Sequence, residues 1–228
     1  MSLMPESKTE SKSDKQKCGF VSVVGLSNVG KSTLVNDMVG QKVSIVSKKV
    51  QTTRSRVLGI SIVDQSQIIL IDTPGIFKPK RTLEKTMVST ALQTIDDADI
   101  VLHMVDARAK NAPQKNKTLL QSFQNHKHAI LVLNKVDTVS KPELLDLSLT
   151  LNDAFPYEAT FMISALKSYG VPDIEAYLAK NVPAGQWLYP EDHVTDMPMR
   201  LMAAEMTRES IFNLLHQEIP YELSLIHI

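Results

Sequence analysis

Eight residues near the start of the chain have the types and spacing of a phosphate-binding loop. They read Gly25-Leu26-Ser27-Asn28-Val29-Gly30-Lys31-Ser32 and satisfy the pattern G-x-x-x-x-G-K-[ST]. The two glycines let the backbone approach an anion closely, so that loop N–H groups and the positive end of a helix dipole face phosphate oxygens. Lys31 would add a positive charge at the β- and γ-phosphates, and Ser32 would offer its hydroxyl to Mg²⁺. A chance match to this pattern is expected in about one chain in a hundred of this length.

A second motif, Asn134-Lys135-Val136-Asp137, has the chemistry of a guanine reader. The Asp137 carboxylate can accept hydrogen bonds from the ring N1–H and the exocyclic amino group of guanine. Adenine has neither donor, and a site built to satisfy donors strongly rejects a ligand without them. Lys135 can lay its aliphatic stem along the purine, and Asn134 can tie this loop to the phosphate loop. Alone the tetrapeptide could equally cap a helix, and a P-loop ATPase or small-molecule kinase remains an alternative that depends on Asp137.

A third segment, Ser164-Ala165-Leu166, would bring backbone N–H groups near the guanine carbonyl. The same three residues could form an ordinary turn. Their position directly after an apolar run favours the base-binding interpretation, because ligands of open parallel sheets bind at the carboxyl ends of the strands.

Two further segments could sense a γ-phosphate. Asp72-Thr73-Pro74-Gly75 follows an apolar run, so that Asp72 would hold Mg²⁺ through water and the Gly75 N–H would donate to the γ-phosphate. The stretch Gln41–Arg56 has five basic residues and no acidic one, which is either a solvated face or a phosphate-facing loop. Within it, Thr53 is the candidate for closing onto Mg²⁺, with Thr52 as the second choice. Two such segments are typical of switch loops. These loops become ordered when a γ-phosphate is bound and are released when it is hydrolysed.

The elements that must position these motifs alternate between strands and helices. Short apolar runs predict strands at Phe20–Val24, Val57–Val63, Ile68–Ile71, Ile100–Val105, Ala129–Leu133 and Thr160–Ile163. Helices are predicted at Lys31–Val39, Thr82–Ile95, Lys115–Asn125, Lys141–Ala154 and Asp173–Lys180. Such alternation predicts an α/β fold with a doubly wound, mostly parallel sheet. Together with the phosphate-binding loop, this indicates a P-loop NTPase. Asp64–Gln67 is short enough for a hairpin, which makes one edge strand antiparallel.

Composition limits the remaining possibilities. The chain has 228 residues, 43% of them apolar, which excludes wholesale disorder, and a single cysteine, which excludes an internal disulfide framework. The longest apolar run, Ala129–Leu133, is far shorter than the roughly 18 residues of a membrane span. We expect a disordered tail over 1–17, a GTP-binding domain over 18–184, a linker over 185–198, and an incomplete α+β appendage over 199–228.

The order of the motifs resembles that of the Era family of bacterial GTPases over residues 19–221. The segments that carry the resemblance, besides the phosphate loop, are Cys18-Gly19-Phe20, Gln51-Thr52-Thr53-Arg54, Asp72-Thr73-Pro74-Gly75, Tyr189-Pro190-Glu191-Asp192 and Ala204-Glu205. Only one set of nucleotide motifs is present, which disfavours the double-domain relatives of the Der type. The resemblance implies Mg²⁺-dependent hydrolysis of GTP to GDP and phosphate, coupled to small-subunit ribosomal RNA binding in 30S ribosome assembly. It also implies a cytoplasmic monomer, with peripheral contact to the inner face of the cell membrane as a further family property.

The resemblance assigns roles to individual residues. Catalysis would fall to Lys31, Thr53, Gly75 and Asn28. GTP would be bound by Gly25, Ser27, Asn28, Val29, Gly30, Lys31, Ser32, Thr33, Asp72, Gly75, Asn134, Lys135, Asp137, Ser164, Ala165 and Leu166. Mg²⁺ would be held by Ser32, Thr53 and Asp72.

Three positions bear on mechanism. Leu26-Ser27 replace the Arg-Pro pair that is usual in the family's phosphate loop, and these side chains should point outward. Ile76 stands where Ras-like GTPases carry a glutamine that orients water, so hydrolysis must use another group. Asn28 matches an asparagine that coordinates K⁺ in relatives, although it could equally stabilise a turn. The alternative function is a guanine-nucleotide-dependent binding module that does not hydrolyse GTP.

The C-terminal part departs from the family's RNA-binding half. That half is a KH domain, whose backbone clamp is a G-x-x-G loop, and no glycine follows Gly185. From Glu191 onward the sequence has seven acidic residues and two arginines. The resulting net charge of −5 would repel phosphates. We therefore expect residues 199–228 to resemble only the start of a KH domain, and this chain to bind RNA weakly.

Overall fold

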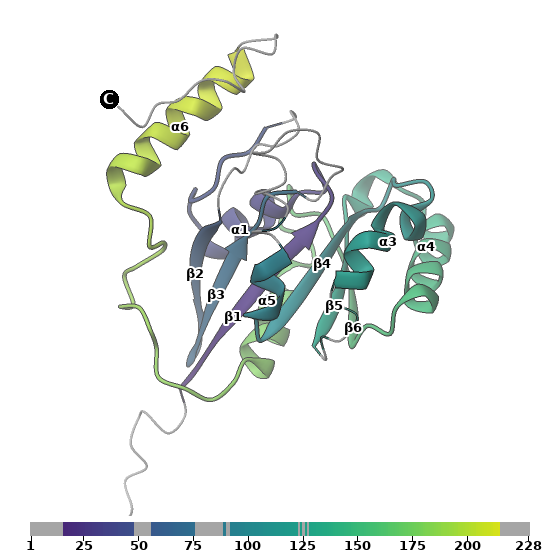
Figure 1. Cartoon of the computed structure of the whole chain (residues 1–228), viewed down its shortest axis with the longest axis horizontal. Coiled ribbons are helices and arrows are strands. Elements are labelled where there is room, and N and C mark those ends of the chain that lie inside the picture. The colour runs from purple at the N-terminus through teal and green to yellow at the C-terminus, as the bar shows by residue number, and fades with distance from the viewer. Residues whose placement is uncertain are drawn as a thin grey trace, which may run out of the picture.

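A single six-stranded sheet organises the protein, as seen in a computed structural model that describes residues 16–47, 56–75, 89, 92–122, 124, 126 and 128–214. The strands are β1 (Lys17–Gly25), β2 (Val57–Val63), β3 (Ser66–Asp72), β4 (Ile100–Asp106), β5 (Ala129–Asn134) and β6 (Ala159–Ile163). Their spatial order is β2-β3-β1-β4-β5-β6 (Figure 1). Only the β2–β3 pair is antiparallel among these strands. The predicted α/β fold with one antiparallel edge strand is confirmed.

Helices cover both faces of the sheet. Helices α1 (Lys31–Val39) and α5 (Val171–Asn181) pack on one face, and α3 (Ala112–Ser122) and α4 (Lys141–Ala154) pack on the other. In β5, Ile130 and Val132 contribute to the α1/α5 core, whereas Leu131 and Leu133 contribute to the α3/α4 core. Because alternate side chains of a strand point to opposite faces, a strand covered twice must be apolar throughout. This explains why the inner strands read as unbroken apolar runs.

Local sequence sets most element boundaries. Helix α1 begins after Gly30 and ends before Gly40, both of which have left-handed backbone conformations. Helix α4 begins with a capping box in which Ser140 and Glu143 satisfy each other's backbone N–H groups. Helix α3 begins at Ala112 rather than at the predicted Lys115, because Pro113 fits the first turn of a helix.

The β2–β3 hairpin is tighter than predicted. Its loop is Asp64-Gln65 rather than Asp64–Gln67, because Ser66 pairs with Val63 and Gln67 pairs with Ile62. Ser66 and Gln67 are polar, so the apolar pattern missed them, yet both are buried. Of the predicted helix Thr82–Ile95, residues 89 and 92–95 are described and are helical; the others lie outside the described residues.

The chain after α5 follows the β2 side of the sheet before it reaches helix α6 (Met199–Leu214) (Figure 1). Gln67 accepts hydrogen bonds from the backbone N–H groups of Leu188 and Tyr189, at 2.9 and 3.0 Å. Further along, the carbonyl of Val194 accepts from the Ile60 N–H at 2.9 Å. We call residues 185–198 the connector; these contacts hold it against β2 and β3.

Several predictions lie outside the described residues. These are residues 1–15 of the tail expected over 1–17, the candidates Thr52 and Thr53, Ile76, and the segment 215–228. The last residue of that expected tail, Lys17, is described and begins β1. Among the helices of the described ranges, none combines the length and apolarity that crossing a membrane requires.

Candidate nucleotide-binding site

A cavity of about 750 Å³ opens at the carboxyl ends of the central strands, where the predicted motifs meet. Its lining residues are Ser27, Asn28, Gly30, Lys31, Ser32, Thr33, Ile45, Val46, Ser47, Gly75, Arg108, Asn134, Lys135, Asp137, Thr138, Ser164, Leu166 and Asn213. Among the predicted site residues that the structure describes, four do not line it but bond to residues that do: Gly25, Val29, Asp72 and Ala165. The sequence motifs thus converge on one hollow of a size suited to a small molecule.

The phosphate loop is held by its glycines. Gly30 has a φ of 104°, a conformation that side chains with a β-carbon rarely adopt. A β-carbon there would also collide with the amide of Asn134, and one on Gly25 would lie 2.5 Å from the Met104 carbonyl oxygen. Both positions therefore require glycine for reasons visible in the fold.

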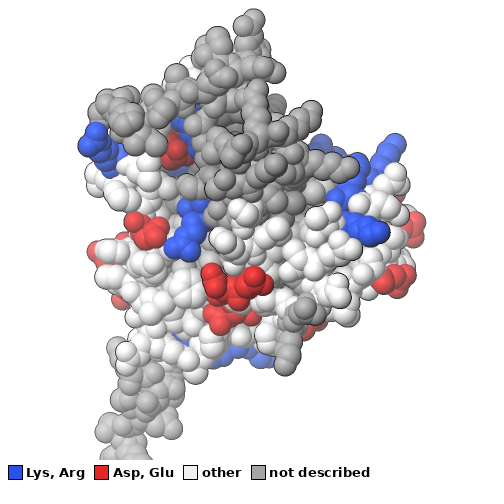
Figure 2. Space-filling view, viewed as in Figure 1, with Lys and Arg blue, Asp and Glu red and all other residues white. Residues whose placement is uncertain are grey.

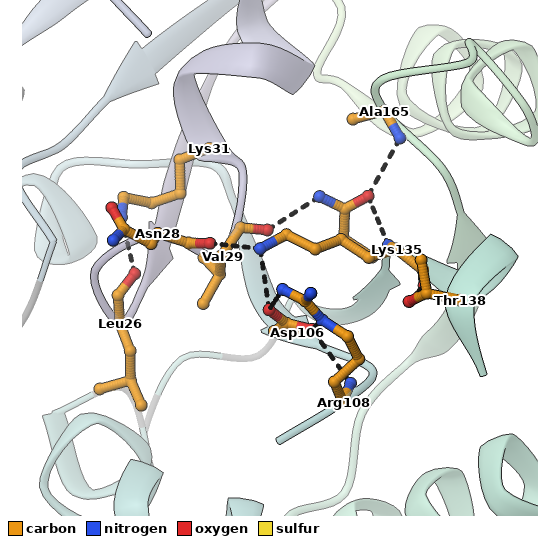
Figure 3. Close-up of polar contacts among 10 residues, drawn as sticks. Leu26, Asn28, Val29, Lys31, Asp106, Arg108, Lys135, Thr138 and Ala165 are labelled. Atoms are coloured by element: carbon orange, nitrogen blue, oxygen red, sulfur yellow. Dashed lines mark hydrogen bonds and ion pairs between the residues drawn. The ribbon is translucent and has the colours of Figure 1, made fainter. Parts of the chain in front are cut away.

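Lys31 is buried at the start of α1 and points back into the loop. Its ammonium donates to the carbonyl oxygen of Gly25 at 3.3 Å. It also donates to that of Leu26 at 3.0 Å (Figure 3). Burial lowers the pKa of Lys31 to about 8, and the nearby Asp72 carboxylate opposes this shift. The ammonium is charged at neutral pH but poorly solvated, which makes it receptive to an anion.

Ser32 and Asp72 bring two hard oxygen donors together beside Lys31. The Ser32 hydroxyl donates to Asp72 Oδ2 at 2.6 Å, and the Ser44 hydroxyl donates to the same oxygen at 2.6 Å. Asp72 is fully buried at the end of β3. Hydroxyl and carboxylate oxygens are the protein ligands that Mg²⁺ prefers when it also binds phosphates. The donor set therefore fits Mg²⁺.

Ser44 is a site residue that the sequence did not single out. Asn36 of α1 fixes its backbone: Asn36 Oδ1 accepts from the N–H groups of Val43 and Ser44 at 2.9 Å, and its amide donates to the Ser44 carbonyl at 2.7 Å. Nothing in the residue types near Ser44 marks it, because the contact depends on how segment 43–45 folds onto α1.

Gly75 lies directly against the phosphate loop. A β-carbon on Gly75 would be 2.7 Å from Ser27 Cα and 2.8 Å from its hydroxyl oxygen. The Ser27 hydroxyl is buried and has no hydrogen-bond partner among the described residues. The expectation that the side chains at positions 26 and 27 point outward is therefore wrong for Ser27, and Leu26 is partly buried against the core. Thr73, two residues earlier, anchors the turn by donating to the Val23 carbonyl at 2.8 Å. The structure therefore places Gly75 beside the phosphate loop.

Asn134 joins three segments of the site. Its amide nitrogen donates to the Val29 carbonyl at 2.8 Å, and its Oδ1 accepts from the backbone N–H groups of Lys135 and Ala165, at 2.8 and 3.0 Å. Lys135 in turn donates to the Asn28 carbonyl at 2.6 Å (Figure 3). The phosphate loop, the N-K-x-D segment and the Ser164–Leu166 turn thus form one connected unit.

Asp137 lies exposed at the other end of the cavity. Its carboxylate pairs with Lys167 at 2.9 Å. The hydrogen bond from Lys167 and a second one from the Ser164 hydroxyl hold the pKa of Asp137 below its usual range. The carboxylate is therefore ionised and available as an acceptor. Lys167 was not predicted, because an exposed lysine in a turn has no distinguishing pattern.

Asp106 and Arg108 are two further site residues that the motifs did not reveal. Asp106 ends β4 beside Asn134 of β5, and its carboxylate binds both Arg108 and Lys135 (Figure 3). One feature of the sequence could have indicated Asp106. It ends a buried strand that neighbours the strand before the N-K-x-D motif, so both must end at the same edge of the sheet.

The fold and the site together define a P-loop GTPase. The family model described as 50S ribosome-binding GTPase matches residues 20–135. The GTPase Era of Brucella melitensis biotype 1 is 50% identical over 213 residues, which cover 93% of this chain and 68% of that protein. The GTPase Era of Bradyrhizobium diazoefficiens is 50% identical over 206 residues, which cover 90% of this chain and 67% of that protein.

Solved structures agree with the sequence comparison. Era in complex with MgGDPNP and nucleotides 1506–1542 of 16S ribosomal RNA superimposes with a TM-score of 0.85 at 40% identity, over 90% of this chain and 70% of that one. A variant of Aquifex aeolicus Era bound to GDP.AlF4⁻ gives a TM-score of 0.83 at 40% identity, with the same coverage. The chain belongs to the Era family of GTPases, as its motifs predicted.

Proposed function

We propose that the chain binds GTP together with Mg²⁺ in this cavity and hydrolyses it to GDP and phosphate. The observation that carries the proposal is that Lys31 and Ser32 line one end of a hollow and Asp137 lines the other, with Asp72 bonded to the Ser32 hydroxyl. The first three offer the charge and oxygen ligands that a triphosphate with Mg²⁺ needs, and Asp137 offers the acceptor that distinguishes guanine from adenine.

At the phosphate end each residue has a distinct task. The Lys31 ammonium would move from its carbonyl contacts onto the β- and γ-phosphates, and the Ser32 hydroxyl and Asp72 would hold Mg²⁺, Asp72 through water. When bound, Mg²⁺ supplies neutralisation of the charge that develops on the phosphates. The Gly75 N–H would donate to the γ-phosphate, and Thr53 would close over the site.

Water activation needs a group other than the residue at position 76, which is isoleucine. We propose that K⁺ held by the Asn28 side chain assists the transition state, a role taken from the family resemblance. The alternative is a nucleotide-dependent binding module without hydrolysis. Phosphate release measured in K⁺ and in Na⁺ separates the two, with Lys31→Ala as the inactive control. The absence of phosphate release in both salts would contradict the enzymatic proposal.

We further propose that the protein acts on the small ribosomal subunit through its RNA during 30S assembly. Support comes from the family and from the solved relative that contains ribosomal RNA. In this proposal residues 18–184 form the GTP-binding domain, 185–198 the linker, and 199–228 the beginning of an RNA-binding KH domain.

This chain alone is expected to bind RNA weakly. Acidic and basic side chains are interspersed over the described part of the face in Figure 2, without a large area of positive charge there, and residues 191–228 carry a net charge of −5. Filter binding to a small-subunit RNA fragment tests this, and nanomolar, sequence-selective binding would contradict it.

We also propose a cytoplasmic monomer, with peripheral contact to the inner membrane face as a secondary location. Sedimentation of the purified chain and cell fractionation test these two statements. A stable dimer would contradict the monomeric state, and recovery solely in the membrane fraction would contradict the cytoplasmic location.

A further inference from the structure

The carboxylate of Asp106 is surrounded by donors at the rim of the nucleotide cavity. Its Oδ2 accepts from Lys135 Nζ at 2.8 Å and from Arg108 Nη2 at 2.7 Å. Its Oδ1 accepts from the Arg108 Nε and from the Arg108 backbone N–H, both at 3.0 Å. The Arg108 guanidinium thus binds the carboxylate in a bidentate manner, the geometry that makes guanidinium–carboxylate pairs specific. Figure 3 shows this group of three side chains beside the phosphate loop.

The sheet fixes where this carboxylate stands. Asp106 is in register with Asn134 of the neighbouring strand, and the N–H of Ala107 donates to the Asn134 carbonyl at 2.8 Å. The next residue after Asn134 is Lys135, so the ladder itself sets the distance between the acid and the lysine. Burial raises the pKa of Asp106, but the hydrogen bonds from Arg108 and Lys135 outweigh it and lower the pKa to about 2, so the carboxylate is ionised at neutral pH.

Lys135 is held at both ends. Its backbone has a φ of 67°, and the Asn28 backbone whose carbonyl it contacts has a φ of 62°. Left-handed conformations are costly for residues with side chains and persist only where the surroundings determine them. The Lys135 ammonium donates to that Asn28 carbonyl and to Asp106, and its side chain is 28% exposed. Its stem therefore spans the cavity rim from the N-K-x-D segment to the phosphate loop.

We propose that Asp106 is a positioning residue that fixes Lys135 in advance as one wall of the guanosine site, with Arg108 holding Asp106 in place. The inference rests on the proposed function, since it deepens how the same site binds guanine nucleotides. A flexible lysine side chain loses rotamer freedom when it is ordered. If Asp106 has already ordered the Lys135 side chain, nucleotide binding does not include this loss of side-chain entropy, and the affinity is higher.

The location of Asp106 predicts which kinetic constants change when this residue is replaced. Asp106 contacts the lysine of the base-reading motif, whereas the γ-phosphate end belongs to Lys31, Ser32 and Gly75. Loss of Asp106 should weaken GTP and GDP equally, because the two nucleotides share the guanosine. Uniform loss of binding raises KM while kcat is retained.

The test is a double-mutant cycle on the full chain with fluorescent GDP and GTP analogues. Asp106→Asn keeps the shape of the side chain and removes its charge. We expect Kd for both nucleotides and KM for GTP to rise about tenfold in this variant. Its kcat should stay within about twofold of that of the unmodified chain. Asp106→Glu should recover part of this loss. In a Lys135→Met background, Asp106→Asn should have no further effect, because the residue acts through Lys135. Arg108→Gln should give a smaller loss in the same direction.

The matched control is Asp146→Asn, an exposed acid on α4 that does not line the cavity. Circular dichroism and thermal unfolding of each variant report whether the fold is intact. An Asp106→Asn variant that binds both nucleotides as Asp146→Asn does would overturn the inference, as would effects of Asp106→Asn and Lys135→Met that simply add. If the unmodified chain binds neither nucleotide, the proposed function itself fails; if it binds both and the cycle shows no coupling, only the role of Asp106 fails.

Discussion

Glu209 on α6 accepts a hydrogen bond from the backbone N–H of Val46 at 3.2 Å, although 163 positions separate the two residues. The same carboxylate forms an ion pair with Lys42, and Glu209 is buried. Val46 and Ser47 line the nucleotide cavity, as does Asn213 of α6. Helix α6 is thus attached to the segment that leads into the candidate switch residues.

Replacing Glu209 by alanine should loosen this attachment. The Val46 N–H would lose its acceptor and Lys42 would lose its ion-pair partner, so two contacts between α6 and this segment would be removed. Hydrogen exchange measured by mass spectrometry should show faster exchange in 42–47 and 199–214. The control is Glu191→Ala, an exposed acid in the connector. Equal exchange in the two variants would show that the contact does not hold α6.

Asp137→Asn should change which purine the site accepts. An asparagine presents one acceptor and one donor where the carboxylate presents two acceptors, so GTP affinity should fall about a hundredfold from the loss of charge-assisted hydrogen bonds. Xanthosine triphosphate, whose 2-oxo group accepts where guanine donates, should be preferred by the variant. Competition binding with GTP, xanthosine triphosphate and ATP measures the change. Retention of the original GTP preference would show that Asp137 does not read the base.

Lys31 should make stability depend on alkaline pH. Its pKa is lowered from 10.5 to about 8 in the folded protein, so between these values the unfolded chain binds more protons than the folded one. The free energy of unfolding should therefore rise from pH 8 to 10 through this residue. Urea unfolding of Lys31→Met should lack that part of the rise, whereas Lys141→Met, which changes an exposed lysine, should keep it. Parallel pH profiles for all three proteins would contradict the prediction.

His103 should produce a similar dependence at acidic pH. It is fully buried, with Nδ1 2.5 Å from the Tyr157 hydroxyl and Nε2 3.1 Å from Asn116 Oδ1. Burial lowers the pKa of His103 from 6.5 to about 4, so stability should be lost as pH falls from 6.5 to 4, by up to about 3 kcal/mol.

The variant that isolates this effect is His103→Gln, which cannot take up a proton. Its unfolding free energy should be lower at pH 7 but should change less between pH 6.5 and 4. His193→Gln, at an exposed position, should behave as the unmodified chain. A steep acid dependence that persists in His103→Gln would assign the effect to other groups.

The sequence was sufficient for the fold and for those site residues that belong to contiguous motifs. Lys31 and Asp137 each stand in a short pattern whose chemistry is local, and the apolar runs marked the strands because both sheet faces are covered. The polar start of β3 was missed, since Gln67 is polar and its hydrogen-bond partners include backbone groups of the connector, which is distant in sequence. Ser44, Asp106 and Glu209 were missed for the same reason: their partners are set by tertiary packing rather than by neighbours in sequence.

The connector also covers part of the exposed edge of the sheet, where another chain could pair with it. Strand β2 is an edge strand, and such an edge offers free backbone donors and acceptors to any extended peptide. Here the Ile60 N–H is bonded to Val194, and the Leu58 carbonyl accepts from the Thr195 hydroxyl at 2.6 Å. The connector therefore occupies two backbone groups of this edge that β-pairing with a second molecule would need.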